Sequence, residues 1–229
     1  MKNRKNNAMY FEEGYIYHIY NQGNNRQMLF FNRDNYLFFL RKIKIHLLPY
    51  VDVLAWCLMP NHFHLMVLVN SAELPIPPTE GLVSAATEGF AHSETLGEGN
   101  RKTRSLNFSI GLMLRSYTNA INKQRKLSGS LFRKNTKAEC INCPTGLTPS
   151  FITSNGVTYF NNEQPERQYP QVCFNYIHQN PVKAGLVSRA EEWEFSSAVD
   201  YTGLRDGKLI SREVAELYVD IGSNRGLRL

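Results

Sequence analysis

An α+β fold is predicted from three observations on this 229-residue chain. Residues 14–20 are rich in aromatic and β-branched side chains, which is typical of a strand. Apolar residues at helical spacing follow over 36–48, and two apolar strands at 51–58 and 62–69 are joined by the short segment 59–61. A strand, a helix and a hairpin in this order indicate a ferredoxin-like βαββαβ antiparallel sheet with helices on one face.

The first helix carries its own start and stop signals. Asp34 is a capping residue, and Pro49 ends the helix because proline has no backbone N–H to donate. The side chains of its apolar face follow helical spacing: Tyr36, Phe39, Leu40, Ile43 and Leu47.

The second half of the chain is predicted to contain two more helices and a helical tail. A long helix is expected over 107–126. Pro170 can open a shorter helix. That helix is predicted to end at Asn180, because the residue before Pro181 resists the α conformation. A last helix near 211–218 forms a C-terminal extension.

One domain with insertions fits this length. Much of 71–104 is rich in Pro, Gly, Ser, Thr and Glu, which predicts a flexible insertion, and a second loop is predicted near 144–168. The domain is expected to span 1–202, and the helical tail 203–229. No apolar run is long enough to cross a bilayer, and no signal peptide is evident, so no membrane partner is expected.

The charge of the chain favours a polyanionic partner. The formal net charge is +6 and the pI is about 9.1. From 101 to 137 every charged residue is Lys or Arg, whereas from 71 to 99 every charged residue is Glu. Such segregation builds a field that attracts phosphates to one side of a protein.

The four cysteines do not form the framework of a secreted disulfide-rich domain. Cys57 lies in an apolar strand and is expected in the core. Cys140 and Cys143 have the spacing of half a zinc site or of a redox pair, but a second Cys-x-x-Cys is missing. A reducing, cytoplasmic setting with nucleoid association is therefore expected.

Two histidines stand two residues apart in the strand at 62–69. Alternate side chains of a strand share a face, so His62 and His64 lie together and Phe63 lies opposite. Two imidazoles on one rigid element form a pair of metal ligands. A bare His-x-His also leaves open two ordinary histidines, one at a strand start and one in a core.

Tyr176 and Asn180 are four residues apart and therefore project from one face of the predicted helix. A phenol can act as a nucleophile, and a carboxamide oxygen can bind a metal ion. Taken alone, they also fit a tyrosine that packs inward and an asparagine that caps a helix end.

Together these motifs resemble a known family. His62-Phe63-His64 resembles the His-hydrophobe-His (HUH) signature of single-strand DNA nucleases. The block 176–187, Tyr-Ile-His-Gln-Asn-Pro-Val-Lys-Ala-Gly-Leu-Val, resembles the tyrosine motif of the REP-associated tyrosine transposases, relatives of the small single-tyrosine insertion-sequence transposases. The likeness covers most of residues 10–202 and includes 116–123, 128–132 and 193–197.

The resemblance implies a role for each residue of the two motifs. Tyr176 would be the nucleophile, and His62, His64 and Asn180 would bind a divalent metal. Related insertion-sequence enzymes carry Gln four residues after the tyrosine, so the shorter Asn180 must lie closer to the metal here. A mixed imidazole and carboxamide shell suits Mg²⁺ or Mn²⁺.

The resemblance also implies a reaction and a substrate. Attack by Tyr176 on single-stranded DNA beside an imperfect hairpin would leave a covalent 5′-phosphotyrosine and a free 3′-OH, which can later rejoin strands. Many family members act as monomers, so a monomer is expected rather than a homodimer.

The basic segment supplies candidates for holding DNA. Their side chains suit phosphate contacts and base stacking, although a solvated helix face explains each of them equally well. They are Arg115, Tyr117, Asn122, Lys123, Lys126, Arg133 and Lys134. Tyr117 is also the rival nucleophile.

Two other functions remain open from the sequence. A non-catalytic nucleic-acid-binding module of ferredoxin-like fold would use the same basic segment, but would give His62, His64 and Tyr176 no joint purpose. A metal-dependent hydrolase needs a carboxylate near the histidines, and none lies close to them in the sequence.

Overall fold

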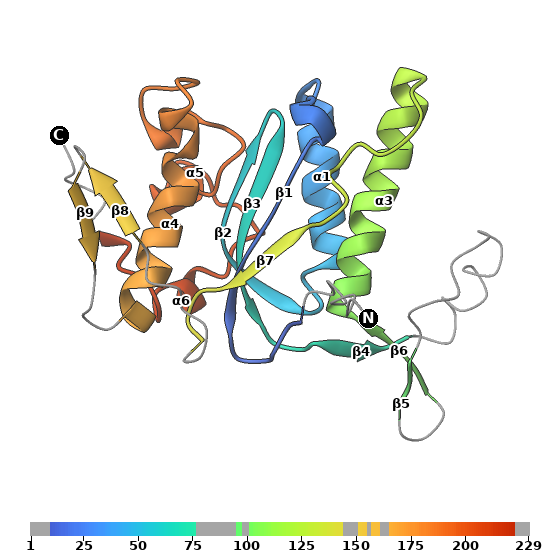
Figure 1. The fold of residues 1–229 in the computed structure, drawn as a ribbon, viewed down its shortest axis with the longest axis horizontal. Helices are drawn as coiled ribbons and strands as arrows, with labels where there is room; N and C mark the ends of the chain where they lie inside the picture. The colour runs from blue at the N-terminus through green and yellow to red at the C-terminus, as the bar shows by residue number, and fades with distance from the viewer. Residues whose placement is uncertain are drawn as a thin grey trace, which may run out of the picture.

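A four-stranded antiparallel sheet forms the centre of the molecule (Figure 1). The computed structural model describes residues 10–76, 95–97, 101–143, 151–154, 157–160 and 165–222. The sheet order is β2-β3-β1-β7, where the strands are β1 (Ile16–Gln22), β2 (Val51–Met59), β3 (His62–Val69) and β7 (Lys137–Cys140). The long helices are α1 (Arg33–His46), α3 (Leu106–Arg125) and α4 (Pro165–Lys183). An antiparallel sheet with separate helices is an α+β fold.

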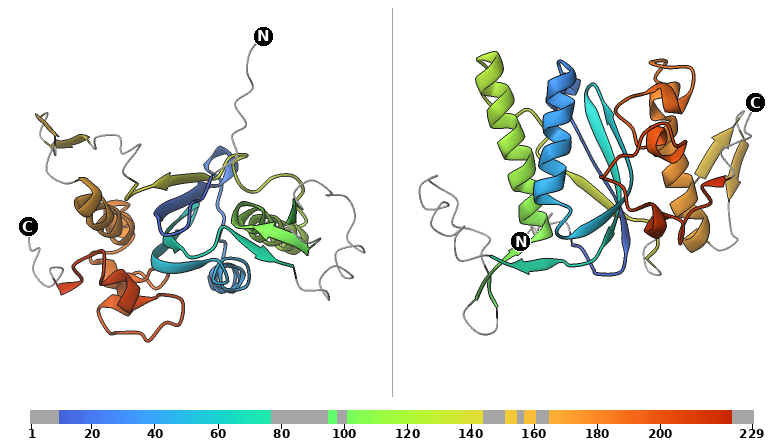
Figure 2. Two further views of the ribbon diagram at one scale, coloured as in Figure 1. Left: turned by 90° about the horizontal axis from the view of Figure 1, so that it is seen from below. Right: turned by 180° about the vertical axis from the view of Figure 1, so that it is seen from behind.

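The two faces of the sheet are covered by different helices (Figure 2). On one face α1 and α3 enclose a core whose fully buried side chains include Phe39, Phe63 and Tyr117. On the other face α4 packs over β2 and β3 and buries Phe174 and Ile177. The prediction that the helices share one face is therefore wrong for α4, because the strands bury apolar side chains on both of their faces.

Side-chain caps set the starts of α1 and α3. The Asn32 side chain accepts a hydrogen bond from the Asn35 N–H at 3.0 Å, so Asn32, and not the predicted Asp34, caps α1. Ser105 caps α3 by accepting from the Phe108 N–H at 3.3 Å.

Helix α4 extends beyond both of its predicted ends. It begins at Pro165, with Pro170 inside it, and it continues past Asn180 through Pro181. The Ala184 N–H still donates to the Asn180 carbonyl at 3.0 Å. A proline inside a helix removes its own N–H bond and crowds one carbonyl, and packing against the sheet outweighs that local cost here. Gly185, with φ of +68°, then ends the helix.

Smaller elements surround this core. Part of the predicted insertion forms a three-stranded sheet. Part of the second predicted loop forms a hairpin, and its residues 165–168 belong to α4; most of the rest of both segments lies outside the described residues. Their strands are β4 (Glu73–Pro75), β5 (Thr95–Gly97), β6 (Arg101–Ser105), β8 (Phe151–Ser154) and β9 (Val157–Phe160). The short helices are η1 (Asn24–Arg26), η2 (Ala190–Glu192), α5 (Ala198–Tyr201) and α6 (Arg212–Ala215). Within the part of the chain that the structure describes, no helix combines the length and apolarity needed to cross a membrane.

The cysteines fall into two groups. Cys140, the last residue of β7, is joined to Cys143 by a disulfide, which leaves neither thiolate for a zinc ion. Cys57 and Cys173 are free and buried, as the apolar strand predicted for Cys57.

Candidate active site

The sheet face beneath α4 carries a group of polar side chains. Residues directly opposite each other on neighbouring antiparallel strands share a face. Each histidine of β3 therefore lies beside a polar residue of β1, and the histidine of β1 lies beside a polar residue of β7. The pairs are His62 with Gln22, His64 with Tyr20, and His18 with Glu139.

Helix α4 brings the predicted tyrosine and asparagine to these histidines. The Tyr176 ring stands edge-on to His64, with 5.4 Å between the ring centroids. The Asn180 Oδ1 lies 3.3 Å from the His62 Nε2, although the two residues are 118 positions apart in the chain. Tyr176 remains 41% exposed, so the residue is accessible to a large substrate. The four residues predicted to act together are thus brought together.

A buried hydrogen-bond network holds α4 against β2. The His178 Nε2 lies 2.7 Å from the Ser197 Oγ, which also accepts from the Trp56 N–H at 2.9 Å. Burial lowers the pKa of His178 to about 3, so this imidazole is neutral in the folded protein. His178 lies between Tyr176 and Asn180 in the sequence, so this network fixes the part of α4 that carries them.

The two histidines of β3 are also neutral. Burial lowers the pKa of His62, and the Asn180 oxygen, which would accept a hydrogen bond from the protonated ring, partly opposes that effect. Burial and then the neighbouring His18 and His62 lower the pKa of His64, to about 2 in all. Neutral imidazole is the form that binds a metal ion.

Hydrogen bonds leave lone pairs facing the space between these side chains. The His62 Nδ1 lies 2.6 Å from the Asn61 Oδ1, so Nδ1 carries the proton and Nε2 presents a lone pair toward the Asn180 oxygen. The His64 Nε2 is buried and has no hydrogen-bond partner. Unpartnered buried polar atoms and facing lone pairs are costly, and a cation would satisfy them.

The donor set fits a divalent cation. Two imidazole nitrogens and one carboxamide oxygen leave room for substrate oxygens, a mixed shell that Mn²⁺ accepts readily and Mg²⁺ tolerates. Among the described residues, no group of three or more His, Cys, Asp and Glu side chains is arranged to hold a metal. A metal held by His62 and His64 would therefore need Asn180 as a third protein ligand.

Three residues of the site were missed in the sequence. His18 contacts His64, with 2.9 Å between the His18 Nε2 and the His64 Nδ1. Tyr20 donates from its hydroxyl to the Glu139 Oε1 at 2.6 Å, and burial followed by this carboxylate raises the pKa of Tyr20. The two-residue spacing of His18 and Tyr20 was visible in the sequence, but Glu139 joins them only through the pairing of β7.

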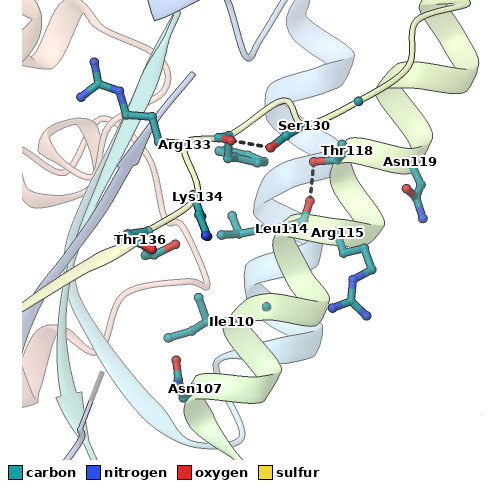
Figure 3. A pocket seen from close by; sticks show the side chains of 14 residues that line it. Asn107, Ile110, Leu114, Arg115, Thr118, Asn119, Ser130, Arg133, Lys134 and Thr136 are labelled. Carbon is teal, nitrogen blue, oxygen red and sulfur yellow. Dashed lines mark hydrogen bonds between the residues drawn. The ribbon is translucent and has the colours of Figure 1, made fainter. Parts of the chain in front are cut away.

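A basic groove of about 750 Å³ lies between α3 and the loop at 129–136 (Figure 3). Arg115, Arg133 and Lys134 line it and are exposed. Its other walls combine apolar with amide and hydroxyl side chains, including Ile110, Leu114, Phe132, Asn107, Asn119, Asn135, Thr118 and Thr136. The guanidinium and ammonium groups of this groove suit anionic groups, and its amide and hydroxyl side chains suit polar edges.

The other predicted DNA contacts do not line this groove. Lys123 and Lys126 are exposed at the C-terminal end of α3. Asn122 donates from its side chain to the Gly129 carbonyl at 2.9 Å, which ties the loop to the helix.

Tyr117 requires a correction. It faces the core, is fully buried, and donates from its hydroxyl to the Leu29 carbonyl at 2.7 Å. Its ring packs edge-on against Phe39, with 4.9 Å between centroids. A ring in this position can neither stack on a base nor attack a phosphate, so its predicted DNA contact and its rival nucleophile role are wrong.

Comparisons with known proteins give one structural likeness. No protein-family model matches the chain, and no curated protein matches its sequence. A solved structure described as a REP-associated tyrosine transposase bound to a REP hairpin is similar, with a TM-score of 0.47 and 16% identity over 96% of this chain and 90% of that chain. At this TM-score and identity the likeness establishes neither a family nor an activity.

Proposed function

We propose that this protein is a metal-dependent endonuclease and strand transferase for single-stranded DNA, of the REP-associated tyrosine transposase type. The observation that carries this proposal is the meeting of His62, His64, Tyr176 and Asn180 on one face of the sheet. A nucleophile beside unprotonated nitrogen and oxygen donors is suited to phosphoryl transfer.

Tyr176 is the attacking group in this proposal. Its Oη forms a bond to the phosphorus of a DNA phosphodiester while the bond from phosphorus to the 3′ oxygen breaks. The 5′ phosphate stays on the tyrosine, and a 3′-OH leaves; attack by a 3′-OH reverses the step and joins strands. The Lys183 Nζ lies 5.6 Å from the Tyr176 ring centroid, where its positive charge attracts the entering phosphate.

His62, His64 and Asn180 would hold the divalent ion, Mg²⁺ or Mn²⁺. When bound, it supplies Lewis-acid polarisation of the phosphate. The burial that keeps both imidazoles neutral prepares this donor set without any change of protonation.

The substrate follows from the surface. The basic groove on α3 suits phosphates and exposed bases, which supports single-stranded DNA with a hairpin as the substrate. One chain contributes all four site residues, which supports action as a monomer. The chain order β1, α1, β2, β3, α3, β7 with the sheet order β2-β3-β1-β7 supports a ferredoxin-like core.

A second candidate is a metal-dependent hydrolase. The sequence lacked a carboxylate near the histidines, but Glu139 lies opposite His18 and accepts from Tyr20. A carboxylate in this position could orient a water molecule instead of a phenol.

One experiment separates these functions. The protein is incubated with labelled hairpin single strands and Mn²⁺ or Mg²⁺ and run on a denaturing gel. Tyr176→Phe and EDTA should each abolish a covalent adduct, and Tyr117→Phe should retain it. Cleavage without an adduct would indicate hydrolysis, and binding without cleavage under either metal would indicate a non-catalytic nucleic-acid-binding module.

A further inference from the structure

His64 has a partner for only one of its two ring nitrogens. Its Nδ1 lies 2.9 Å from the His18 Nε2, and the two rings are stacked at 25° with centroids 5.0 Å apart. Both side chains are buried, at 9% exposure for His18 and 5% for His64. The contact is therefore a fixed feature of the interior.

Only one of the two rings can donate in this contact. If His18 donates to the Nδ1, the remaining proton of His64 sits on its Nε2, as a buried donor without an acceptor. If His64 donates from its Nδ1, its Nε2 presents a lone pair instead. The second arrangement matches His62, where the Nδ1 contact with Asn61 leaves the Nε2 lone pair facing Asn180.

We propose that His18 is a positioning residue for the metal site: it accepts the Nδ1 proton of His64 and so presents the His64 Nε2 lone pair to the cation. This inference rests on the proposed function. Ligating histidines are generally oriented by a partner on their second nitrogen. Here that partner comes from another strand, on a residue with no place in the histidine or tyrosine motif.

The position of His18 in the sheet allows it to fix the orientation of the His64 ring. Strand β1 is paired on both sides, with Met66 and Glu139 opposite His18 on its two neighbours. A residue on a strand held at both edges has little freedom to move, so the orientation of His64 is set by the sheet itself.

The tautomer can be read directly in the metal-free, full-length protein. Long-range ¹H–¹⁵N spectra of protein with ¹⁵N-labelled histidine distinguish a protonated from an unprotonated ring nitrogen. We expect His64 to carry its proton on Nδ1 and to have an unprotonated Nε2. A proton on the His64 Nε2 would overturn the inference.

Metal binding supplies a second, independent readout. Titration with Mn²⁺, followed by the electron paramagnetic resonance signal of the free ion, gives the affinity without DNA or turnover. We expect His18→Leu to weaken Mn²⁺ binding about 10- to 100-fold, as loss of an outer-shell partner does. His18→Gln, which retains an acceptor, should recover part of that loss.

The matched control is His46→Leu, in the last turn of α1 and outside the site. It should leave Mn²⁺ affinity unchanged, and His18→Leu should leave metal-free binding of hairpin DNA unchanged. Equal Mn²⁺ affinity in His18→Leu and wild type would overturn the inference. If wild type does not bind Mn²⁺, or if a His62→Leu protein binds it equally well, the metal site of the proposed function is refuted instead. If His18→Leu does not fold, the tautomer measurement still decides.

Discussion

The two faces of the central sheet differ although the same strands form both. On β3, Phe63 and Leu65 point to the core beneath α1 and α3, while His62 and His64 point to α4. The first face is an aromatic and aliphatic core, and the second surrounds a group of histidines, a tyrosine and a carboxylate. The core on one face therefore fixes the backbone from which the chemical groups of the other face project.

The largest expected effect is a loss of reaction rate on the α4 face. His64→Gln should slow adduct formation about 10³-fold, because Lewis-acid stabilisation is worth several kcal/mol and each 1.4 kcal/mol is a factor of ten. Single-turnover assays at saturating DNA measure this rate. The free energy of unfolding should fall by only about 1 kcal/mol, the worth of the lost hydrogen bond between the His64 Nδ1 and His18, because the ring Nε2 has no partner to lose. A His64→Gln protein that cleaves at the wild-type rate would remove His64 from the site.

The opposite result is expected one residue earlier. Phe63→Ala should lower the free energy of unfolding by about 3–5 kcal/mol, since it leaves a cavity among packed aromatic side chains. Urea denaturation measures the loss. At low temperature, the folded fraction should retain its Mn²⁺ affinity. A large fall in that affinity would show that the two faces are less independent than the register implies.

Acid should lower the free energy of unfolding mainly through groups on the α4 side of the sheet. The buried histidines among the described residues, His18, His64 and His178, all lie on that side. Burial lowers the folded-state pKa of His178 to about 3, below the unfolded value near 6.5. The unfolded state therefore binds more protons than the folded state between these two pH values. The contribution of His178 to stability is full above pH 6.5 and is lost as the pH falls toward 3.

For His178 alone the loss is on the order of 2 kcal/mol between pH 6.5 and pH 5. Urea denaturation at several pH values should show it, and His178→Gln should have a flatter dependence of the unfolding free energy on pH. Because His18 and His64 titrate in the same direction, the difference between wild type and His178→Gln is the informative quantity. Parallel pH curves would contradict a neutral, buried His178.

The smallest expected effect tests the core face. Tyr117→Phe removes the hydrogen bond to the Leu29 carbonyl and should cost about 1 kcal/mol of stability. Its rate of adduct formation should match wild type. Loss of DNA cleavage in a folded Tyr117→Phe protein would restore the catalytic role that burial argues against.

Much of this fold follows from local patterns. Alternation along β3 and helical spacing in α1 depend on neighbouring residues, so the shared face of His62 and His64 could be predicted. The i, i+4 relation likewise placed Tyr176 and Asn180 together on α4. Their approach to the histidines was inferred from the resemblance to a family, and the contact between His62 and Asn180 agrees with that expectation.

The remaining features depend on pairings that no local pattern contains. The place of α4 on the second face and the extension of α4 through Pro181 follow from packing against β2. Glu139 reaches the site only because β7 pairs with β1; the βαββαβ prediction implied a fourth strand but did not assign it to residues 137–140. Tyr117 was assigned by the charge of its neighbours, whereas its own position on α3 points to the core.

The most direct test of the site is to identify the residue that becomes linked to DNA. After reaction with a hairpin single strand and Mn²⁺, nuclease digestion and tandem mass spectrometry locate the residual 5′ phosphate. The account predicts the peptide that carries Tyr176. A phosphate on Tyr20, which lies beside His64 and Glu139 on the same face, or on any other residue, would contradict it.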